Sequence, residues 1–323
     1  MSTKTKKCPF CEGRDVIKKG MQDGLQTYKC TDCSKRFRTR RKEKENLIKE
    51  IWDTYIFHKQ TIRELKDLYH KDKKTIVSYL DAYTPPPKKH NPRPVHLVAD
   101  ATYFGLRTDG TSWCIVVFRD PKEKENLWWT YGQTETQSLY QRGREELERL
   151  GYTILSVTGD GFSGLRSAFF GIPFQMCHVH MERIIIRATT RNPKLFESQI
   201  LLALIKTLFD TDEATFKRRF SLYIERYRDF LNERAKSEST GSWWYVHDEV
   251  RKAVFSLQRL LPYLFTYTEH IDIPHTTNSL EGHFRHINEI VAIHCGLSKQ
   301  RKMKVLDTIM LEGSIVQKKK KRD

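Results

Sequence analysis

The hydrophobic positions of the chain follow two different periods, and the changes between them divide the sequence into regions. Between residues 46 and 82 apolar residues recur with helical spacing, which predicts helices over residues 46–58, 61–69 and 73–82. From residue 95 short apolar runs predict strands over residues 95–103, 113–119, 126–132, 153–158 and 173–177, with helices over 136–150, 163–170 and 179–189. Helical spacing then returns, over residues 195–209, 213–232 and 245–264.

The order of these elements predicts the fold class. A meander of three strands followed by alternating helix and strand is the order of the ribonuclease-H-like fold, so we expect an α/β catalytic domain of that class with an all-α insertion. Residues 84–94 hold five prolines, which exclude a helix or a central strand and favour a stiff extended spacer. The expected domains are a zinc ribbon (1–42), a helix-turn-helix (43–83), a proline-rich linker (84–94), the catalytic domain (95–191 and 272–323) and the helical insertion (192–271).

Two aspartates stand at the ends of predicted strands. Asp100 lies among apolar residues in the first strand, and Asp160 follows the apolar strand 153–158. A charge in such surroundings needs a partner, and a divalent metal ion is one. Glu281, in a late stretch with helical spacing, is the third candidate, and Glu182 competes with it. Three carboxylates suit a pair of Mg²⁺ or Mn²⁺ ions of the kind that promotes phosphodiester chemistry.

Four cysteines near the N-terminus have the spacing of a zinc ribbon. Two C-x2-C pairs are separated by eighteen residues: Cys8, Cys11, Cys30 and Cys33. Each pair can wrap two thiolates around one face of a metal ion, and two pairs complete the tetrahedral site that structural Zn²⁺ favours. The interval predicts a hairpin of residues 15–19 and 25–29 with a turn at 21–24. The alternative is a pair of redox dithiols, but the βαβ pattern typical of these is missing.

The three helices predicted between residues 46 and 82 have the short connections of a helix-turn-helix. The third would be the recognition helix, and its outward residues are Lys73, Lys74, Ser78 and Tyr79. The alternative is a three-helix packing unit without a role in DNA binding. The inward residues are Leu47, Ile48, Ile51, Trp52, Tyr55, Ile56, Ile62, Leu65, Leu68, Ile76, Val77 and Leu80.

A basic run over residues 35–42 follows the cysteine motif. It includes Arg38, Arg40 and Arg41, which we expect to follow a DNA backbone unless the run is simply a solvated charged face.

Charge and cysteine usage limit the function classes further. The 323 residues carry a net charge of +17, of which +12 lies in residues 1–95. Such a surplus indicates a polyanionic partner, most often nucleic acid, although some basic proteins have none. Seven cysteines, four of them in C-x2-C pairs, fit a reducing compartment and a metal site. With no apolar run of membrane-spanning length and no signal-peptide core, we expect a cytoplasmic protein without a membrane partner.

Taken together, these features resemble bacterial insertion-sequence transposases of the Mutator-like superfamily, in a branch that carries an N-terminal zinc ribbon. The resemblance rests on Asp100 in VADATYFG, Asp160 in TGDGFSGL, the C-x2-H element of Cys177 and His180, and Glu281 in NSLE followed by Arg285. It implies a DDE triad of Asp100, Asp160 and Glu281 in a ribonuclease-H-like fold. It therefore favours Glu281 over Glu182.

Cys177 and His180 have two interpretations. They lie beside the acids, where they orient a ligand or contact the scissile strand, or they are a buried thiol and a core histidine.

The paired Trp243 and Trp244 in the insertion also have two interpretations. Burial in the core is the usual outcome for tryptophan, and stacking on DNA bases is the alternative.

The resemblance implies a DNA transposase. Such an enzyme binds double-stranded DNA at terminal inverted repeats, cleaves the element ends and transfers the 3′-OH strand into target DNA by two-metal catalysis. Because two ends must be held together, a homodimer or higher homo-oligomer is expected. The alternatives are a ribonuclease-H-like nuclease or resolvase, which would cut without joining, and a non-catalytic DNA-binding regulator.

Overall fold

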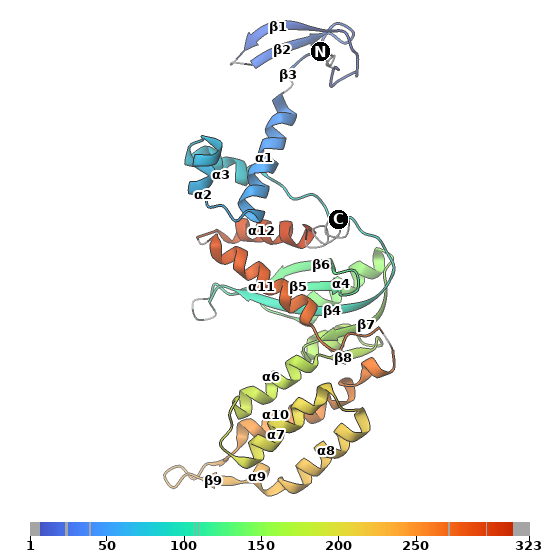
Figure 1. The fold of residues 1–323 in the computed structure, drawn as a ribbon, viewed down its shortest axis with the longest axis vertical. Helices are drawn as coiled ribbons and strands as arrows, with labels where there is room; N and C mark the ends of the chain where they lie inside the picture. The colour runs from blue at the N-terminus through green and yellow to red at the C-terminus, as the bar shows by residue number, and fades with distance from the viewer. Residues whose placement is uncertain are drawn as a thin grey trace. The chain divides into compact units, whose positions relative to one another are not determined.

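The computed structural model describes residues 7–22, 25–38, 40–106, 108, 110–270, 272–294 and 296–312 (Figure 1). The chain divides into two compact units, Met1–Pro86 with Glu289–Asp307 and Pro87–Asn288 with Thr308–Asp323. The first boundary falls inside the predicted proline-rich linker. The expected catalytic domain took in all of residues 272–323, whereas residues 289–307 group with the N-terminal unit.

The first unit begins with a small antiparallel sheet in the order β1-β2-β3, formed by β1 (Val16–Gln22), β2 (Leu25–Cys30) and β3 (Arg36–Arg38). Its core is the stacked pair Tyr28 and Phe37, whose ring centroids are 5.7 Å apart, with the buried Cys8 and Cys30 beside it. Strand β3 was not predicted. It contains part of the basic run, and Arg36 and Arg38 are exposed on either side of the buried Phe37.

Three helices follow: α1 (Arg40–Phe57), α2 (Ile62–Tyr69) and α3 (Lys73–Ala82). Thr61 caps α2 by accepting a hydrogen bond from the Glu64 backbone N–H at 3.3 Å, while the Glu64 carboxylate accepts one from the Thr61 N–H at 2.6 Å. Asp72 caps α3 through a 2.9 Å hydrogen bond from the Thr75 N–H. One inward assignment was wrong: Leu68 is 59% exposed, because the short α2 buries only Leu65.

Residues from the two last helices complete the first unit. Helices α11 (Asn278–Ile293) and α12 (Lys299–Glu312) contribute residues to both units. Within the first unit, the His294 ring lies 3.9 Å from the ring of Tyr55, and Arg301 binds both carboxylate oxygens of Asp81 at 2.6 and 2.7 Å. The Lys304 ammonium donates to the carbonyl oxygens at the C-terminal end of α3, namely those of Leu80, Asp81 and Tyr83.

The second unit is built on a mixed five-stranded sheet in the order β6-β5-β4-β7-β8. Its strands are β4 (Pro94–Phe104), β5 (Trp113–Asp120), β6 (Glu125–Gly132), β7 (Thr153–Gly159) and β8 (Phe174–Met176). Strands β4, β5 and β6 form an antiparallel meander, and β7 and β8 continue the sheet in parallel with β4. The five predicted strands are all present, with ends shifted by at most one residue. Every residue of β5 is buried, as expected for a strand with strands on both sides.

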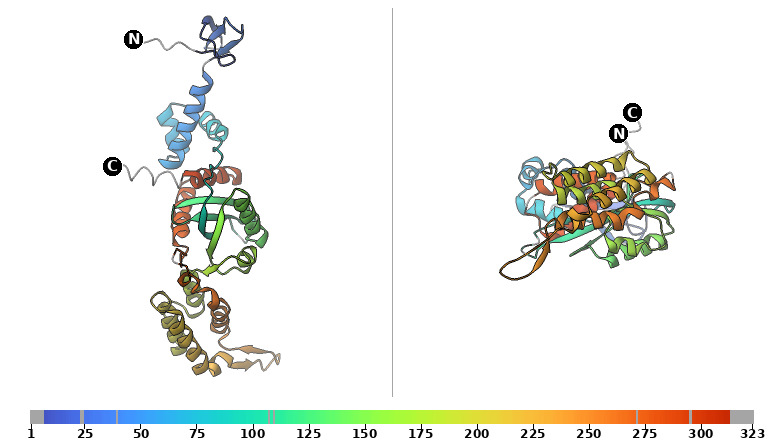
Figure 2. Two further views of the ribbon diagram at one scale, coloured as in Figure 1. Left: turned by 90° about the vertical axis from the view of Figure 1, so that its right-hand side faces the viewer. Right: turned by 90° about the horizontal axis from the view of Figure 1, so that it is seen from below.

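Helices cover the two faces of this sheet (Figure 2). Helix α4 (Gln137–Arg149) packs on one face, where Tyr140 stacks on Phe118 with ring centroids 6.0 Å apart. Alternate residues of a strand point to opposite faces, so Arg119 and its neighbour Asn126 lie on the other face. There Asn126 Nδ2 is 2.9 Å from His283 Nε2 of α11. Helices α5 (Ser163–Ala168) and α6 (His178–Thr189) follow β7 and β8.

The end of the proline-rich linker is anchored to the sheet. Arg93 donates to Asp120 at 2.7 Å and to Glu125 at 2.9 Å, and Lys88 also pairs with Glu125. Because Asp120 is buried and accepts hydrogen bonds from Arg93, it anchors the end of the linker. The stretch just before β4 is therefore a fixed part of the second unit rather than a free spacer.

The insertion between α6 and α11 is mainly helical and shares a core with the sheet. Its helices are α7 (Phe196–Lys206), α8 (Glu213–Arg226), α9 (Arg228–Asn232) and α10 (Asp248–Leu260), with 3-10 turns η1 (Thr207–Phe209), η2 (Leu261–Tyr263) and η3 (Thr266–Thr268). A two-stranded hairpin of β9 (Arg234–Lys236) and β10 (Trp243–Tyr245) was not predicted, and for this reason α10 begins later than expected. In the part of the chain that is described, no helix combines the length and apolar character needed to cross a membrane.

Candidate active site

Asp100 and Asp160 meet because they leave two neighbouring parallel strands at the same level. In the pairing of β4 with β7, Val98 lies opposite Thr158, and each aspartate follows two residues later. Adjacent strands are about 4.8 Å apart, so the two carboxylates emerge side by side. Asp100 points to the face of the sheet that α11 covers, since it alternates with the core residues Leu97 and Ala99.

The turn after β7 fixes Asp160. Its Oδ1 accepts a hydrogen bond from the Phe162 N–H at 3.0 Å. Gly161 has φ of +79°, and a Cβ there would lie 2.7 Å from Met176 Sδ. A larger residue at this position would meet backbone strain and a clash, so the glycine keeps the turn tight.

The segment before α11, which leads to Glu281, is bonded to the ends of β7 and α6. Three hydrogen bonds tie it there: Thr158 Oγ1 to the Pro274 carbonyl (2.6 Å), His178 N–H to the His275 carbonyl (3.0 Å) and Thr277 N–H to Cys177 Sγ (3.3 Å). Helix α11 starts at the next residue and places Glu281 in its first turn, where the Glu281 N–H donates to the Thr277 carbonyl at 3.0 Å.

Three side chains surround the Glu281 carboxylate. Arg183 of α6 donates to both oxygens, at 2.8 and 2.6 Å. His180 Nε2 lies 3.7 Å from Oε1, and Thr277 Oγ1 lies 3.4 Å from the same oxygen. The glutamate is thus held in one orientation without a metal ion.

The charges of the neighbouring acids affect the pKa of Asp100. Burial, the charge of Asp160 and, to a smaller extent, the charges of Glu135 and Glu281 together raise the pKa of Asp100 to about 8. A hydrogen bond from the Ala101 N–H to Asp100 Oδ1, at 2.8 Å, acts in the opposite direction. Carboxylates that raise one another's pKa in this way are stabilised by a cation between them. The donor set of Asp100, Asp160 and Glu281 therefore fits hard divalent ions such as Mg²⁺.

Glu135 is a fourth acid that the sequence pattern did not reveal. It lies in the loop between β6 and α4, where the Tyr140 hydroxyl donates to its carboxylate and its own N–H donates to the Tyr103 hydroxyl at 3.2 Å. Burial and the charge of Asp160 raise the pKa of Glu135. A single glutamate in a polar loop has no distinguishing sequence signal.

Cys177 and His180 occupy different environments. Cys177 is fully buried, and its thiol lies 3.3 Å from Thr277 Oγ1, so it can orient the acid-bearing segment but cannot touch DNA. His180 is half-buried and lies 3.4 Å from the same Thr277 oxygen through Nδ1. Burial lowers the pKa of His180, although Asp160 and Glu281 oppose this effect.

Glu182 is turned away from the acids. His180 and Arg183, three residues apart on α6, both face Glu281. Successive helical residues point about 100° apart, so Glu182 lies off this face. The spacing of three residues between His180 and Arg183 is the sequence signal that points to Arg183.

The four N-terminal cysteines converge. Their Sγ atoms all lie within 4.8 Å of one another, with Cys8 to Cys33 and Cys11 to Cys30 both at 3.6 Å. A tetrahedron with Zn–S bonds of about 2.3 Å has sulfurs about 3.8 Å apart, so this set of thiols fits zinc.

The predicted DNA-binding residues lie on the first unit. Lys73 and Lys74 are exposed in the first turn of α3, and Ser78 is exposed one turn later. Tyr79 is half-buried, with the ammonium groups of Lys44 and Lys71 at 5.9 and 6.0 Å from its ring. Arg38 is exposed on β3, and the side chains of Arg40 and Arg41 lie outside the described residues.

Residues 98–290 match the sequence model of the transposase IS66 family, which is more than half of the chain. The chain belongs to this family. It is a DDE-type insertion-sequence transposase family, so its members process DNA. The match takes in Asp100, Asp160 and Glu281, whereas the cysteine cluster and the three N-terminal helices precede it. Placement in the Mutator-like superfamily, and in a branch with a zinc ribbon, stays a prediction.

Two solved structures are similar to the transposase at low identity. The Drosophila P element transposase strand transfer complex is 10% identical, with a TM-score of 0.41, over 82% of this chain and 91% of the other. The simian T-cell lymphotropic virus intasome in complex with PP2A regulatory subunit B56 gamma is 15% identical, with a TM-score of 0.21, over 50% of this chain and 69% of the other. No sequence among curated proteins matches the chain.

Proposed function

We propose that this chain is the transposase of its own mobile element, cutting phosphodiester bonds at the element ends and joining the freed strand to target DNA. The observation that carries the proposal is the position of Asp100 and Asp160, which leave neighbouring parallel strands at one level. The segment that leads into α11 and Glu281 is bonded to the ends of β7 and α6, and this supports Glu281 as the third acid. The strand order β6-β5-β4-β7-β8, with the last two strands parallel to β4, supports a ribonuclease-H-like domain.

The acids would hold two divalent ions, Mg²⁺ or Mn²⁺. When bound, such a pair activates the attacking oxygen and stabilises the leaving oxygen of a phosphodiester displacement. Asp100 and Asp160 would provide ligands from the sheet, and Glu281 would add a third from α11. Arg183 and Thr277 orient Glu281, and Glu135 is hydrogen-bonded to Tyr140.

The reaction needs no nucleophilic side chain. Water attacks the phosphodiester at the element end, and the strand is released with a 3′-hydroxyl and a 5′-phosphate. That hydroxyl then attacks a phosphodiester of the target and displaces a second 3′-oxygen. His180, half-buried beside Glu281, is in position to contact a phosphate oxygen or the departing strand.

The first unit would select the DNA. We propose that α2 and α3 form a helix-turn-helix, with Lys73, Lys74 and Ser78 facing the major groove and Tyr79 with its neighbouring lysines beside the backbone. The four-cysteine ribbon would hold one structural zinc ion, and Arg38 would add a phosphate contact. Because both ends must be joined, we expect the active form to be a homodimer or a higher homo-oligomer.

A cleavage and joining assay tests the proposal. The substrate is DNA carrying the segments that flank the gene, with Mg²⁺ or Mn²⁺, and wild type is compared with Asp160→Asn. Glu225→Gln, the same chemical change at an exposed acid of α8, is the matched control. We expect nicking at a defined end and joined products from wild type and Glu225→Gln, and neither from Asp160→Asn. Nicking without joining would indicate a nuclease, and specific binding without cleavage would indicate a regulator.

A further inference from the structure

The tryptophans of the insertion are on the surface, not in the core. Trp243 and Trp244 are 65% and 51% exposed, on the hairpin of β9 and β10. This hairpin projects beyond the helices of the insertion (Figures 1 and 2). Two exposed tryptophans in succession are uncommon on a surface without a partner, because each leaves a large apolar ring in water.

Cations alternate with aromatic rings along one face of the hairpin. Trp243 pairs with Lys236 and Tyr245 pairs with Arg234, and these residues share a face because they are two apart on each strand. The Lys236 ammonium is 5.5 Å from the Trp243 ring, and the Arg234 guanidinium is 4.8 Å from the Tyr245 ring. We call these four residues, with Arg251 and Phe255 described next, the cation–aromatic stripe.

The stripe continues from the hairpin onto α10. The Arg251 guanidinium lies 3.9 Å from the Tyr245 ring and 4.5 Å from the ring of Phe255, which is 49% exposed. Trp244 points to the opposite face of the hairpin from Trp243, so both faces present an indole ring.

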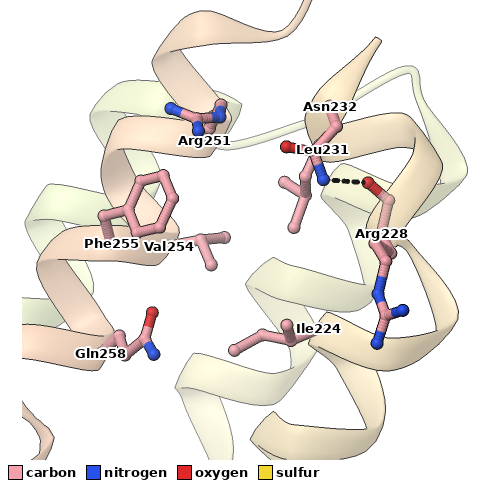
Figure 3. A pocket seen from close by; sticks show the side chains of 8 residues that line it. All are labelled: Ile224, Arg228, Leu231, Asn232, Arg251, Val254, Phe255 and Gln258. Carbon is pink, nitrogen blue, oxygen red and sulfur yellow. Dashed lines mark hydrogen bonds between the residues drawn. The ribbon is translucent and has the colours of Figure 1, made fainter.

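A pocket of about 250 Å³ adjoins this end of the stripe (Figure 3). Arg251 and Phe255 belong to both the stripe and the pocket, and Nε of Arg251 is buried without a hydrogen-bond partner in the described structure. An unpaired buried donor favours a ligand with an acceptor atom. The walls combine apolar and hydrogen-bonding side chains: Ile224, Arg228, Leu231, Asn232, Arg251, Val254, Phe255 and Gln258.

The local charges favour an anionic occupant. Of the nearby acids, Glu233 is 3.0 Å from His247 and Asp248 is 2.6 Å from Lys252, so both are paired. Within the described part of the chain, the acids Asp229 and Glu238 form no salt bridge, and neither do the four cations of the stripe and the pocket: Arg228, Arg234, Lys236 and Arg251. The cations therefore outnumber the unpaired acids. Exposed aromatic rings can stack on nucleic-acid bases, and cations beside the rings can neutralise the neighbouring phosphates.

We propose that the stripe and the pocket bind unpaired DNA, with Trp243 and Trp244 stacking on bases and the pocket receiving one base turned out of the strand. Stacking on aromatic side chains accepts any base, and Arg234 and Lys236 neutralise the neighbouring phosphates. The pocket has apolar walls to hold a ring and polar side chains to meet its edge atoms. The inference rests on the proposed function, which generates unpaired strands at the cut ends.

Fluorescence anisotropy with full-length protein tests the proposal. The probes are a labelled mixed-sequence single strand and a labelled blunt duplex carrying the gene-flanking segment. We compare wild type with Trp243→Ala, Trp244→Ala, Trp243→Phe and Phe255→Ala. The matched control is Leu222→Ala, an equally exposed apolar residue of α8 at 57% exposure. We expect single-strand affinity to fall by about 5- to 100-fold in Trp243→Ala, Trp244→Ala and Phe255→Ala. It should recover largely in Trp243→Phe and stay unchanged in Leu222→Ala, and circular dichroism should show the same fold throughout.

The outcomes separate this inference from the proposed function. If wild type cuts and joins duplex ends but binds single strands weakly, or equally well with and without Trp243 and Trp244, the inference is overturned and the function stands. If no variant, including wild type, cuts or joins, the proposed function fails, whatever the single-strand result. A shift in oligomeric state in Trp243→Ala, measured by light scattering, with single-strand affinity unchanged, would mean that a second copy covers the stripe.

Discussion

Arg183 binds Glu281 through both carboxylate oxygens, at 2.8 and 2.6 Å. The pair joins α6 to α11, two helices separated in sequence by the whole insertion. A cation that used Glu281 as a ligand would have to share this carboxylate with the guanidinium, whose positive charge lies beside the same two oxygens. We therefore expect Arg183 both to position Glu281 and to weaken its binding of a metal ion.

Removing Arg183 should make metal binding easier. In Arg183→Gln we expect the Mg²⁺ concentration for half-maximal cleavage to fall by up to about fivefold, because a partly exposed ion pair contributes roughly 0.2–1 kcal/mol. The maximal rate should also fall, since Glu281 loses its fixed orientation. Titration of Mg²⁺ in the cleavage assay measures both values, with Arg187→Gln on the same helix as the control. An unchanged or higher half-maximal concentration would contradict the competition.

Asp100 should make the metal-free protein less stable as pH rises. Its folded pKa, about 8, lies above its ordinary value, so the unfolded chain releases this proton first. The stability that protonated Asp100 provides is complete at low pH and is lost as pH rises toward 8. In EDTA, Asp100→Asn should melt at a higher temperature than wild type, and the gain should grow from pH 5 to pH 8. If the gain in melting temperature did not change with pH, titration of Asp100 would be excluded as its cause.

The buried His178 should make the folded protein less stable as the pH falls below 6.5. Burial lowers its pKa to about 4; its Nε2 lies 2.7 Å from the Leu264 carbonyl, and its Nδ1 has no partner in the described structure. The unfolded chain takes up a proton near pH 6.5 and the folded chain does not, so stability present above pH 6.5 is lost as pH falls toward 4. In His178→Gln the unfolding free energy should change less between pH 6.5 and 4. Urea unfolding across this range measures the slope, with the exposed His270→Gln as the control.

The four N-terminal cysteines should hold one zinc ion per chain. Cys30→Ser removes a fully buried ligand and should reduce zinc content close to zero, whereas Cys114→Ser, in β5, should retain it. Mass spectrometry of the bound metal measures this. Because so small a sheet has little core, the zinc-free ribbon should lose amide-exchange protection. Equal zinc content in the two variants would rule out the site.

Lys304 should stabilise the end of α3. Its ammonium donates to the carbonyl oxygens of Leu80, Asp81 and Tyr83 at 2.7–2.9 Å and lies 5.2 Å from the Trp52 ring. Lys304→Met keeps the aliphatic length but leaves these carbonyls without the donor. We expect a loss of about 1–3 kcal/mol in the stability of the first unit. Amide hydrogen exchange in α3 should show it, and Lys302→Met, two residues earlier on α12, is the control.

The sequence pattern predicted the elements that local chemistry specifies. The strands that carry Asp100 and Asp160, the cap at Thr61 and the convergence of the cysteines are all present in the structure. Each depends on residues close in sequence: an apolar run, a capping side chain, or a pair of thiols. Leu68 shows the limit of this method, because helical spacing alone placed it inward and it is exposed.

Only the tertiary structure decided which elements face one another. Family resemblance favoured Glu281 over Glu182, and this choice stays a prediction; the structure adds that residues 274–277, just before α11, are bonded to the ends of β7 and α6. Glu135 joins the acids through a loop that carries no signal, and Trp243 is exposed because its strand pairs within a projecting hairpin. By itself, the sequence determined most of the elements, their order and the clustering of the four cysteines, since these follow from local spacing. The position of Glu135, the ion pair of Arg183 with Glu281 and the cation–aromatic stripe depend on contacts between segments far apart in the sequence. The spacing of hydrophobic residues does not predict such contacts.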